Sequence, residues 1–360
     1  MKKVLEPLTT NFFRSFGERN SALARQIIVS PARQPPWEHQ MFMSLLNQKR
    51  SRKRYLQDRW AVILAGGDGT RLRSLTRSIT GDERPKQFCP IVGGRTLLDQ
   101  TRSRVANAVS PTRTMFVLTK THQAFYTPLL TAVPRNLLLV QPENKGTAPA
   151  IVYALTRLAW RSPKAMVALF PSDHHFSDDE TFMAHVEAAF AATRVRPETI
   201  TLLGITPEGP EVEYGWIEPH SSLLGSLPRA ITRVRRFWEK PSAPLANELM
   251  IRGCLWNSFV MVGRVDAFLR TAQRALPELC EMFARLAPAF ETDEEVGRLT
   301  NLYAKIPSVN FSQEVLAMRP DDLAVMKVDQ VGWSDLGEPS RVLKTLARLG
   351  SHAEWAMPTA

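Results

Sequence analysis

From residue 60 onward, short apolar runs alternate along the chain with longer amphipathic stretches. A short apolar run bounded by turn residues is typical of a buried strand, and a longer amphipathic stretch is typical of a helix. Strands that alternate with helices favour the α/β class, and we expect a Rossmann-like, mixed and mostly parallel sheet flanked by helices. The predicted strands are residues 61–65, 114–119, 137–140, 165–170, 199–204, 214–217, 231–238, 257–262 and 323–328. The predicted helices are residues 96–108, 148–160, 179–193 and 339–350, with several others after residue 265.

The first sixth of the chain has a different composition. Residues 1–59 combine scattered apolar groups with several prolines and a basic run at residues 49–54. We interpret them as a basic N-terminal extension, followed by one domain at residues 60–350 and a tail at 351–360. Either an anionic partner or a solvated linker explains the basic run, and a run this short favours the linker. Translation that starts at Met41 or Met43 is a further alternative.

Most of the net charge of +11 belongs to that extension. Residues 1–59 hold 12 Lys and Arg and 4 Asp and Glu, so they carry +8 and the remaining residues carry only +3. Phosphate backbones attract Lys and Arg, which makes nucleic-acid binding the first interpretation of a basic chain. A nearly neutral domain argues against that interpretation. With 44% apolar and 22% charged residues, the composition is globular and excludes a disordered or collagen-like chain.

The cysteines and the hydropathy pattern indicate the compartment. Cys89, Cys254 and Cys280 are widely spaced and include no Cys-x-x-Cys pair, which argues against a zinc site or a disulfide framework and predicts reduced thiols. No apolar run approaches the ~18 residues of a membrane-spanning helix. The N-terminus lacks the charged start and apolar run of a signal peptide. We therefore expect a cytoplasmic protein without a membrane span.

The first predicted strand continues directly into a glycine-rich loop at residues 66–72, Gly-Gly-Asp-Gly-Thr-Arg-Leu. Glycines allow backbone N–H groups to approach an anion, and Arg71 adds a bidentate phosphate donor. The loop is not a P-loop, because no Gly-Lys-Ser/Thr ends it. It is not a dinucleotide fingerprint either, because Leu72 replaces the third glycine and no helix start follows. These absences argue against ATPases and dehydrogenases, and a purely structural turn is the alternative to an anion site.

Two further residues suit a polyphosphate ligand. Lys86 follows Pro85, which keeps the chain extended and helps to aim the lysine. Beside the glycine-rich loop this lysine suggests a triphosphate cradle, with a surface ion pair as the alternative. Asp173 follows an apolar run, where α/β sheets place ligands, and a carboxylate there suits Mg²⁺. His174 and His175 have no third ligand at a suitable spacing, which argues against a transition metal.

These motifs resemble the signature of the sugar-1-phosphate nucleotidyltransferases, also called NDP-sugar pyrophosphorylases. The resemblance covers about residues 60–345, and the Pro-Lys-Gln-Phe form at residues 85–88 is most similar to mannose-1-phosphate guanylyltransferases. In family order, the motifs occupy residues 64–72, 84–88, 141–142, 146–150, 170–174, 214–217, 238–241, 255–258 and 332–337.

The resemblance implies a reaction in which a sugar 1-phosphate attacks the α-phosphorus of an NTP and releases pyrophosphate. It favours mannose 1-phosphate as the sugar substrate and GTP as the NTP. It implies Mg²⁺ as the cofactor and these small molecules as the partners, while a homodimer stays open. The implied catalytic residues are Arg71, Lys86 and Asp173, and the implied metal ligands are Asp173 and Asp335. The implied nucleotide-binding residues are Leu64, Ala65, Gly66, Gly67, Gly69, Thr70, Arg71, Lys86, Gln141, Gly146, Thr147 and Ser172. The implied sugar-phosphate-binding residues are Tyr214, Gly215, Glu239, Lys240 and Asn257.

Three departures from the pattern of the guanylyltransferases stand out. Gln141 replaces their usual Glu before Pro142, and Lys145-Gly146 replaces their usual Arg-Asn. Phe259 replaces the glycine that usually follows Asn257-Ser258. The first two lie near the base and the third near the sugar, so the same reaction with another base or sugar is an alternative. A non-catalytic sugar-nucleotide sensor and a nucleic-acid-binding protein are the alternatives from other classes.

Overall fold

The computed structural model of the protein describes residues 58–221 and 231–350. Residues 1–57, which hold most of the predicted basic extension, and the predicted tail at 351–360 lie outside the described residues. No helix in the described part of the chain is long and apolar enough to cross a membrane. All three cysteines are buried and free of disulfide bonds, as their spacing predicts.

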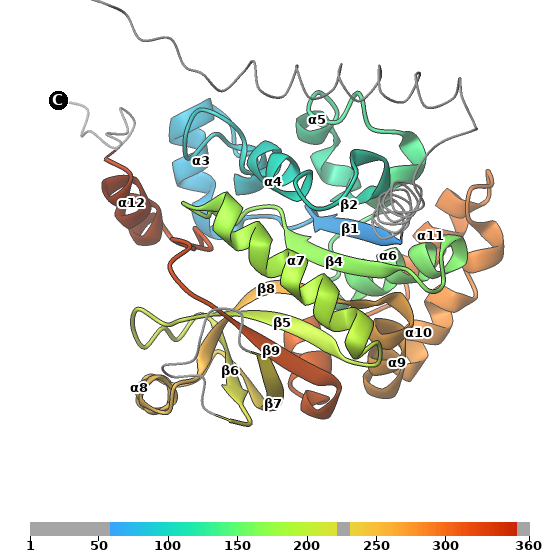
Figure 1. Ribbon diagram of the computed structural model, residues 1–360. Coiled ribbons are helices and arrows are strands. Elements are labelled where there is room, and N and C mark those ends of the chain that lie inside the picture. The colour runs from blue at the N-terminus through green and yellow to red at the C-terminus, as the bar shows by residue number, and fades with distance from the viewer. Residues whose placement is uncertain (1–57, 222–230, 351–360) are drawn as a thin grey trace, which may run out of the picture. The chain divides into compact units, whose positions relative to one another are not determined.

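The described residues form one nine-stranded mixed sheet (Figure 1). Its strands are β1 (Arg59–Leu64), β2 (Thr114–Thr119), β3 (Leu138–Gln141), β4 (Met166–Pro171), β5 (Ile200–Ile205), β6 (Gly215–Pro219), β7 (Ile231–Glu239), β8 (Leu255–Arg264) and β9 (Leu323–Val328). In space they follow the order β3-β2-β1-β4-β8-β5-β9-β7-β6. The first four are parallel, and β8 runs antiparallel to both β4 and β5. The loops after β1, β3 and β4 therefore meet at one edge of the sheet, where α/β proteins bind ligands.

Helices cover both faces of this sheet, and α7 crosses the near face in Figure 1. The α-helices are α3 (Arg73–Thr80), α4 (Leu97–Val105), α5 (Gln123–Tyr126), α6 (Thr147–Arg161), α7 (Asp179–Val195), α8 (Ala243–Ile251), α9 (Val265–Ala275), α10 (Pro277–Ala284), α11 (Glu295–Tyr303) and α12 (Pro339–Arg348). Shorter helical turns are η1 (Thr70–Leu72), η2 (Lys86–Phe88), η3 (Pro111–Arg113), η4 (Lys120–His122), η5 (Arg135–Leu137), η6 (Ala287–Ala289), η7 (Ser312–Leu316) and η8 (Pro320–Asp322).

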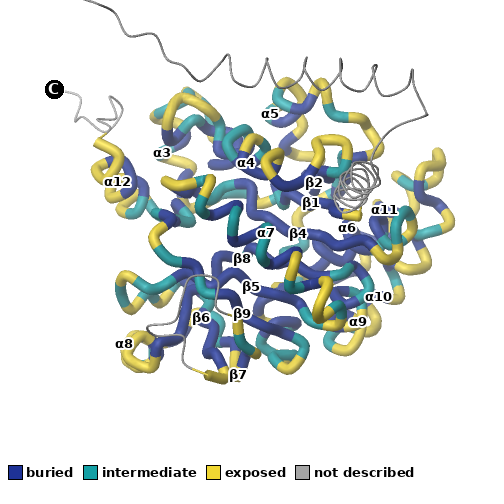
Figure 2. The backbone as a smooth tube through the Cα atoms, in the orientation of Figure 1, coloured by how far each residue is buried: buried dark blue, intermediate teal, exposed yellow. Residues whose placement is uncertain are grey.

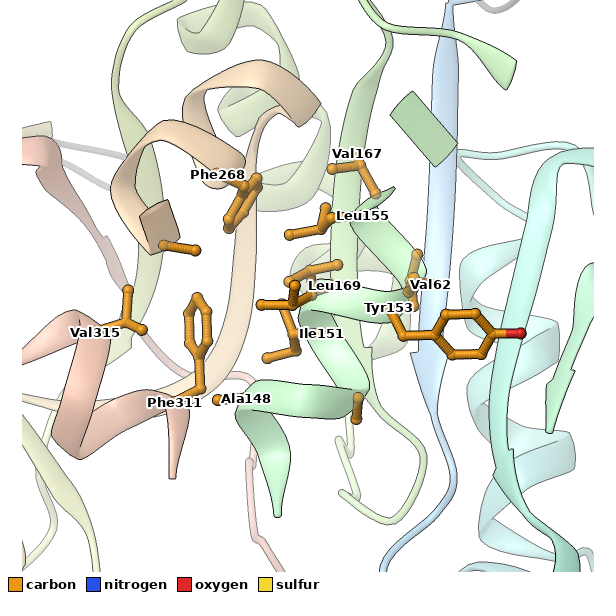
Figure 3. Close-up of a cluster of buried hydrophobic side chains, with 14 of the residues drawn as sticks. Val62, Ala148, Ile151, Tyr153, Leu155, Val167, Leu169, Phe268, Phe311 and Val315 are labelled. Carbon is orange, nitrogen blue, oxygen red and sulfur yellow. The ribbon is translucent and has the colours of Figure 1, made fainter. Parts of the chain in front are cut away.

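The central strands are buried on both faces, and neighbouring residues of a strand belong to different clusters. On β1, Val62 belongs to the first cluster, whereas Ala61 and Ile63 belong to the second. The first cluster joins the sheet to α6, α9 and α10 and includes Phe311 (Figure 3), while the second joins it to α4 and α7. Figure 2 shows the same arrangement, with buried strands inside and exposed loops outside. Two-sided burial explains why these strands appear in the sequence as continuous apolar runs.

The predicted α/β class and helix-flanked sheet are confirmed, and each predicted strand matches an observed one within two residues at either end. The prediction that no helix follows the glycine-rich loop is wrong, because α3 begins directly after η1. The N-cap residue of α3 is Leu72, which supplies no side-chain cap. The apolar stripe of α3 consists of only Leu75 and Ile79, which lie one turn apart. Neither of the usual signals of a helix start was therefore present in the sequence.

A third cluster holds the last described helix beside the glycine-rich loop. Val342 and Leu346 of α12, together with Leu336, pack with Leu72 from the end of the loop. Leu75 and Ile79 of α3 pack against the same cluster. Residues from the two ends of the described chain are thus fixed next to one another at the edge where the ligand loops meet.

The first cluster should dominate the stability of the domain. Ile151 in α6 is fully buried in it, so Ile151→Ala leaves a cavity and should lower the free energy of unfolding by about 2–5 kcal/mol. Ile251, which ends α8, is 81% exposed and supplies the matched control, since Ile251→Ala should change stability by less than about 0.5 kcal/mol. Urea titrations measure both values, and equal losses in the two variants would contradict this assignment of the core.

Candidate active site

A pocket of about 310 Å³ opens at the edge of the sheet where β1, β3 and β4 end. The loop 65–72 follows β1, Gln141 ends β3, and Asp173 comes directly after β4. Many of the residues proposed from the sequence line this pocket: Leu64, Gly66, Gly67, Gln141, Gly146, Thr147, Ser172 and Asp173. The structure thus brings the predicted nucleotide-binding segments together, although they span more than 100 positions along the chain.

Side chains hold the carbonyl oxygens of the glycine-rich loop. Gln87 Nε2 donates to Ala65 O at 3.1 Å and to Gly67 O at 2.7 Å, and Thr119 Oγ1 donates to Gly66 O at 2.9 Å. A Cβ atom on Gly66 would lie 2.8 Å from Thr119 Oγ1, so only glycine fits. Because the negative ends of these carbonyl dipoles already accept hydrogen bonds from side chains, they repel an anion bound on the loop less strongly.

Gly146, one of the departures from the guanylyltransferase pattern, is required by the backbone. Its φ of +86° lies in the left-handed region, and a Cβ atom there would lie 2.5 Å from Val309 O. The same carbonyl oxygen accepts a hydrogen bond from Ala148 N, and Thr147 Oγ1 accepts one from Phe311 N at 2.8 Å. The segment around Val309 therefore supports the start of α6 at the pocket.

Lys86 connects Asp173 to the segment that contains Asp335. Its side chain is only 11% exposed, and its Nζ lies 3.3 Å from Asp173 Oδ2. The same ammonium donates to the backbone oxygens of Asp335 and Leu336. Lys86, Asp173 and Asp335 are thus adjacent although they come from three distant segments. A largely buried ammonium beside a phosphate loop is placed to neutralise phosphate charge.

The Asp335 carboxylate belongs to a dense network of hydrogen bonds. Its Oδ1 accepts from the hydroxyl of Tyr214 at 3.0 Å and from Gly337 N at 2.9 Å. Arg341 of α12 donates to both carboxylate oxygens, at 3.2 and 3.1 Å. Burial opposes the charge of Asp335, but Lys86 and the other neighbouring cations hold the pKa of this carboxyl below its ordinary value. Arg341 was not singled out in the sequence.

The carboxylates suit a hard cation, although the two differ. Asp173 is 28% exposed at the end of a parallel strand, and its carboxylate, paired with Lys86 through Oδ2, is of a kind that binds Mg²⁺. Asp335 Oδ1 already accepts three hydrogen bonds, whereas Oδ2 accepts one, from Arg341, so Oδ2 is the oxygen that would join the ion. Among the described residues no group of three or more His, Cys, Asp or Glu is placed to hold a metal ion. A Mg²⁺ ion at Asp173 would therefore complete its coordination with phosphate oxygens and water.

The two histidines after Asp173 are largely buried, and burial lowers the pKa of each imidazole. His174 Nδ1 accepts a hydrogen bond from Trp333 Nε1 at 3.2 Å. Because this nitrogen accepts a hydrogen bond from the indole, it carries no proton. This geometry favours neutral imidazoles that support the pocket wall.

One exposed carboxylate, which the sequence did not indicate, joins two predicted phosphate-binding cations. Glu213 lies 3.2 Å from Arg71 and 3.1 Å from Lys240. The hydrogen bond and charge of Lys240 contribute most to lowering the pKa of Glu213, and Arg71 adds to the shift. The cations assigned to the NTP and to the sugar phosphate thus meet at one carboxylate.

The remaining predicted sugar-binding residues lie on β6, β7 and β8. Gly215 pairs with Glu239 in the sheet, and a Cβ on Gly215 would lie 3.1 Å from Glu239 Oε2. Burial raises the pKa of the Glu239 carboxyl. Asn257, on β8, is largely buried, and its Oδ1 accepts a hydrogen bond from Phe259 N at 3.0 Å. Asn257 therefore orders its own turn on β8.

Three further contacts near the predicted base site were missed because their partners are far apart in sequence. Tyr303 of α11 donates to Gln141 Oε1 at 2.8 Å and fixes that amide. Asp68 lies 3.2 Å from His122 Nε2 and accepts from Asn144 Nδ2 at 2.8 Å. These contacts fix Gln141 and Asn144, which line the pocket, before any ligand binds.

The glycine-rich loop, the buried lysine and the carboxylates at one sheet edge define a nucleotide-binding α/β protein. The family described as Nucleotidyl transferase matches residues 60–351, and the chain belongs to that family. The resemblance stated from the motifs is thereby confirmed.

Several relatives carry more specific names. The xanthan biosynthesis protein XanB of Xanthomonas campestris is 29% identical over 292 residues, which cover 80% of this chain and 59% of that protein. A mannose-1-phosphate guanylyltransferase of Escherichia coli is 26% identical over 282 residues, or 77% of this chain and 59% of that one. The chain thus spans about 59% of the length of these curated relatives. The crystal structure of a mannose-1-phosphate geranyltransferase from Thermus thermophilus has a TM-score of 0.69 at 27% identity and covers 82% of this chain and 80% of its own.

The network around Asp335 should make stability depend on acid pH. Because its pKa is lowered in the folded protein, its contribution is complete above the ordinary value of 3.8 and is lost as the pH falls through the lowered folded value. Asp335→Asn should lower the free energy of unfolding by about 1–3 kcal/mol at pH 7, since Arg341 loses a charged partner. The difference from wild type should shrink as the pH falls below about 4. Urea titrations between pH 7 and 3 measure it, and a difference independent of pH would contradict the network.

Proposed function

We propose that the protein is a Mg²⁺-dependent sugar-1-phosphate nucleotidyltransferase that makes GDP-mannose from GTP and mannose 1-phosphate. The observation that carries this proposal is the position of Lys86, whose ammonium lies beside Asp173 and whose backbone N lies next to Gly69 of the glycine-rich loop. The names of the Escherichia coli and Thermus thermophilus relatives support mannose 1-phosphate as the sugar substrate. The three buried, unbonded cysteines support a reducing compartment such as the cytoplasm.

The reaction needs positioning and charge neutralisation more than covalent catalysis. A phosphate oxygen of the sugar 1-phosphate attacks the α-phosphorus of the NTP, a new P–O bond forms, and the bond to the β-phosphate oxygen breaks to release pyrophosphate. The glycine-rich loop and Arg71 hold the triphosphate, and Lys86 neutralises charge at the α-phosphate. Lys240 binds the sugar phosphate, and Glu239 accepts hydrogen bonds from sugar hydroxyls.

In this proposal the Mg²⁺ ion binds at Asp173. Asp173 would hold it, and Asp335 would contribute through Oδ2, the oxygen that accepts only the bond from Arg341. When bound, Mg²⁺ supplies neutralisation of the phosphate charge during transfer. Lys86 contacts the same carboxylate and keeps it oriented before substrate arrives.

The same reaction with another base or sugar is the second candidate. It is favoured by Gln141, whose amide is already bound to Tyr303, and by Phe259 in the pocket wall. Both residues lie where the family pattern has a different side chain. The test therefore has to cover several substrate pairs.

Pyrophosphate release, measured across NTPs and sugar 1-phosphates with Mg²⁺, tests the proposal. GTP with mannose 1-phosphate should give the highest kcat/KM. Asp173→Asn should lower kcat at least about 10²-fold, because it removes the metal-binding carboxylate. Asp293→Asn, at an exposed position outside the pocket, is the control and should retain wild-type activity. Absence of pyrophosphate with every pair, or full activity of Asp173→Asn, would overturn the proposal.

Glu213 should weaken substrate binding, because phosphates must compete with its carboxylate for Arg71 and Lys240. Glu213→Gln should lower the Kd for the NTP about 2- to 5-fold at low salt, in keeping with the strength of exposed ion pairs. The effect should shrink as the salt concentration rises. Glu208→Gln breaks a comparable ion pair with Arg348 and serves as the control. Titration calorimetry gives the Kd values, and weaker binding by Glu213→Gln would mean that the carboxylate assists the substrate instead.

A further inference from the structure

Phe259 has an unusual backbone conformation at a bulge in β8. Leu202 of β5 pairs with Met261, and Gly204 pairs with Asn257, so one residue on β5 faces three on β8. Phe259 is the middle one of these three, and its φ is +60°. This is the left-handed region, which glycine adopts freely and a bulky side chain rarely does.

The surrounding structure holds Phe259 in this conformation. Ser258 is fully buried, and its Oγ donates to Leu203 O at 2.6 Å and accepts from Val260 N at 3.2 Å. Phe259 N donates to Asn257 Oδ1 at 3.0 Å. Side chains thus replace the ladder hydrogen bonds that the bulge removes. Strain that is maintained by such contacts is typical of functional sites, where a bulge re-aims one side chain.

The bulge aims Phe259 at the pocket. The residue is half-buried, packs against the first hydrophobic cluster and lines the pocket together with Ala150, Asp173 and His174. The pocket volume of about 310 Å³ is at the small end for a ligand site, so a ring in its wall removes a substantial share of the space. The hydrogen bond to Asn257 couples the position of the ring to a residue assigned to the sugar.

We infer that Phe259 determines which sugar 1-phosphate the site accepts, because its ring stands in the pocket wall and its backbone is bonded to Asn257, the residue assigned to the sugar. Hexose 1-phosphates that carry only hydroxyls fit beside the ring, and 2-acetamido sugar 1-phosphates are excluded. The inference rests on the proposed nucleotidyltransferase function and assigns a specificity to its sugar site. A glycine at this position would adopt the left-handed conformation without strain but would leave the space of the ring empty.

Two variants separate the ring from the strain. Phe259→Gly removes the ring and suits a φ of +60°, whereas Phe259→Ala removes the ring and keeps the strain. Both should raise the ratio of kcat/KM for N-acetylglucosamine 1-phosphate to that for mannose 1-phosphate by about 10-fold or more. Phe259→Gly should also unfold at a higher temperature than Phe259→Ala, by about 2–4 °C.

The inference is overturned if both variants fold and the ratio stays at the wild-type value. It is also overturned if the ratio is constant while the KM for the NTP changes, because the ring would then contact the nucleotide. Calorimetric Kd values for the two sugar 1-phosphates are measured in parallel. If the wild type releases no pyrophosphate with any pair, the proposed function fails, and the change in relative Kd still decides the role of Phe259.

Discussion

The contact on which the site depends is the ammonium of Lys86 between the carboxylate of Asp173 and the backbone oxygens of Asp335 and Leu336. These groups come from the turn η2, from the end of β4 and from the segment before α12. A cation that is only 11% exposed needs such partners, because an unpaired buried charge destabilises a protein by several kcal/mol. The same charge is available to phosphate oxygens once a substrate enters. The Lys86 contact therefore joins three distant segments of the fold and places a positive charge at the site.

The C-terminal part of the domain is as important to the site as the glycine-rich loop. Arg341 of α12 binds Asp335 and also lies 2.9 Å from Glu211, and its guanidinium stacks over the Tyr214 ring. The third hydrophobic cluster fixes α12 against the end of the loop. The position of the second predicted metal ligand is thus set by a helix that contributes no ligand itself.

The strands, and the segments that meet at the pocket, could be predicted from the sequence because each carries a local signal. A buried strand is a continuous apolar run, and the turn that holds Lys86 is a short motif with a proline. The contacts of Glu213, Arg341 and Tyr303 are pairs of side chains separated by many residues, and no local pattern indicates them. The helix α3 escaped prediction for a related reason, since packing against the third cluster compensates for its missing cap.

The strand order has a consequence for how the chain folds. The β4 strand receives its second neighbour only from β8, and β5 lies between β8 and β9. During synthesis the parallel half therefore keeps an open strand edge until residues 255–264 emerge, and the carboxylate of Asp335 arrives later still. Strand pairings between residues this far apart along the chain make folding slow. Until β8 pairs, the unpaired edge of β4 is prone to aggregation. The pocket edge that holds Asp173 and Asp335 is therefore complete only after the C-terminal part of the domain has been synthesised.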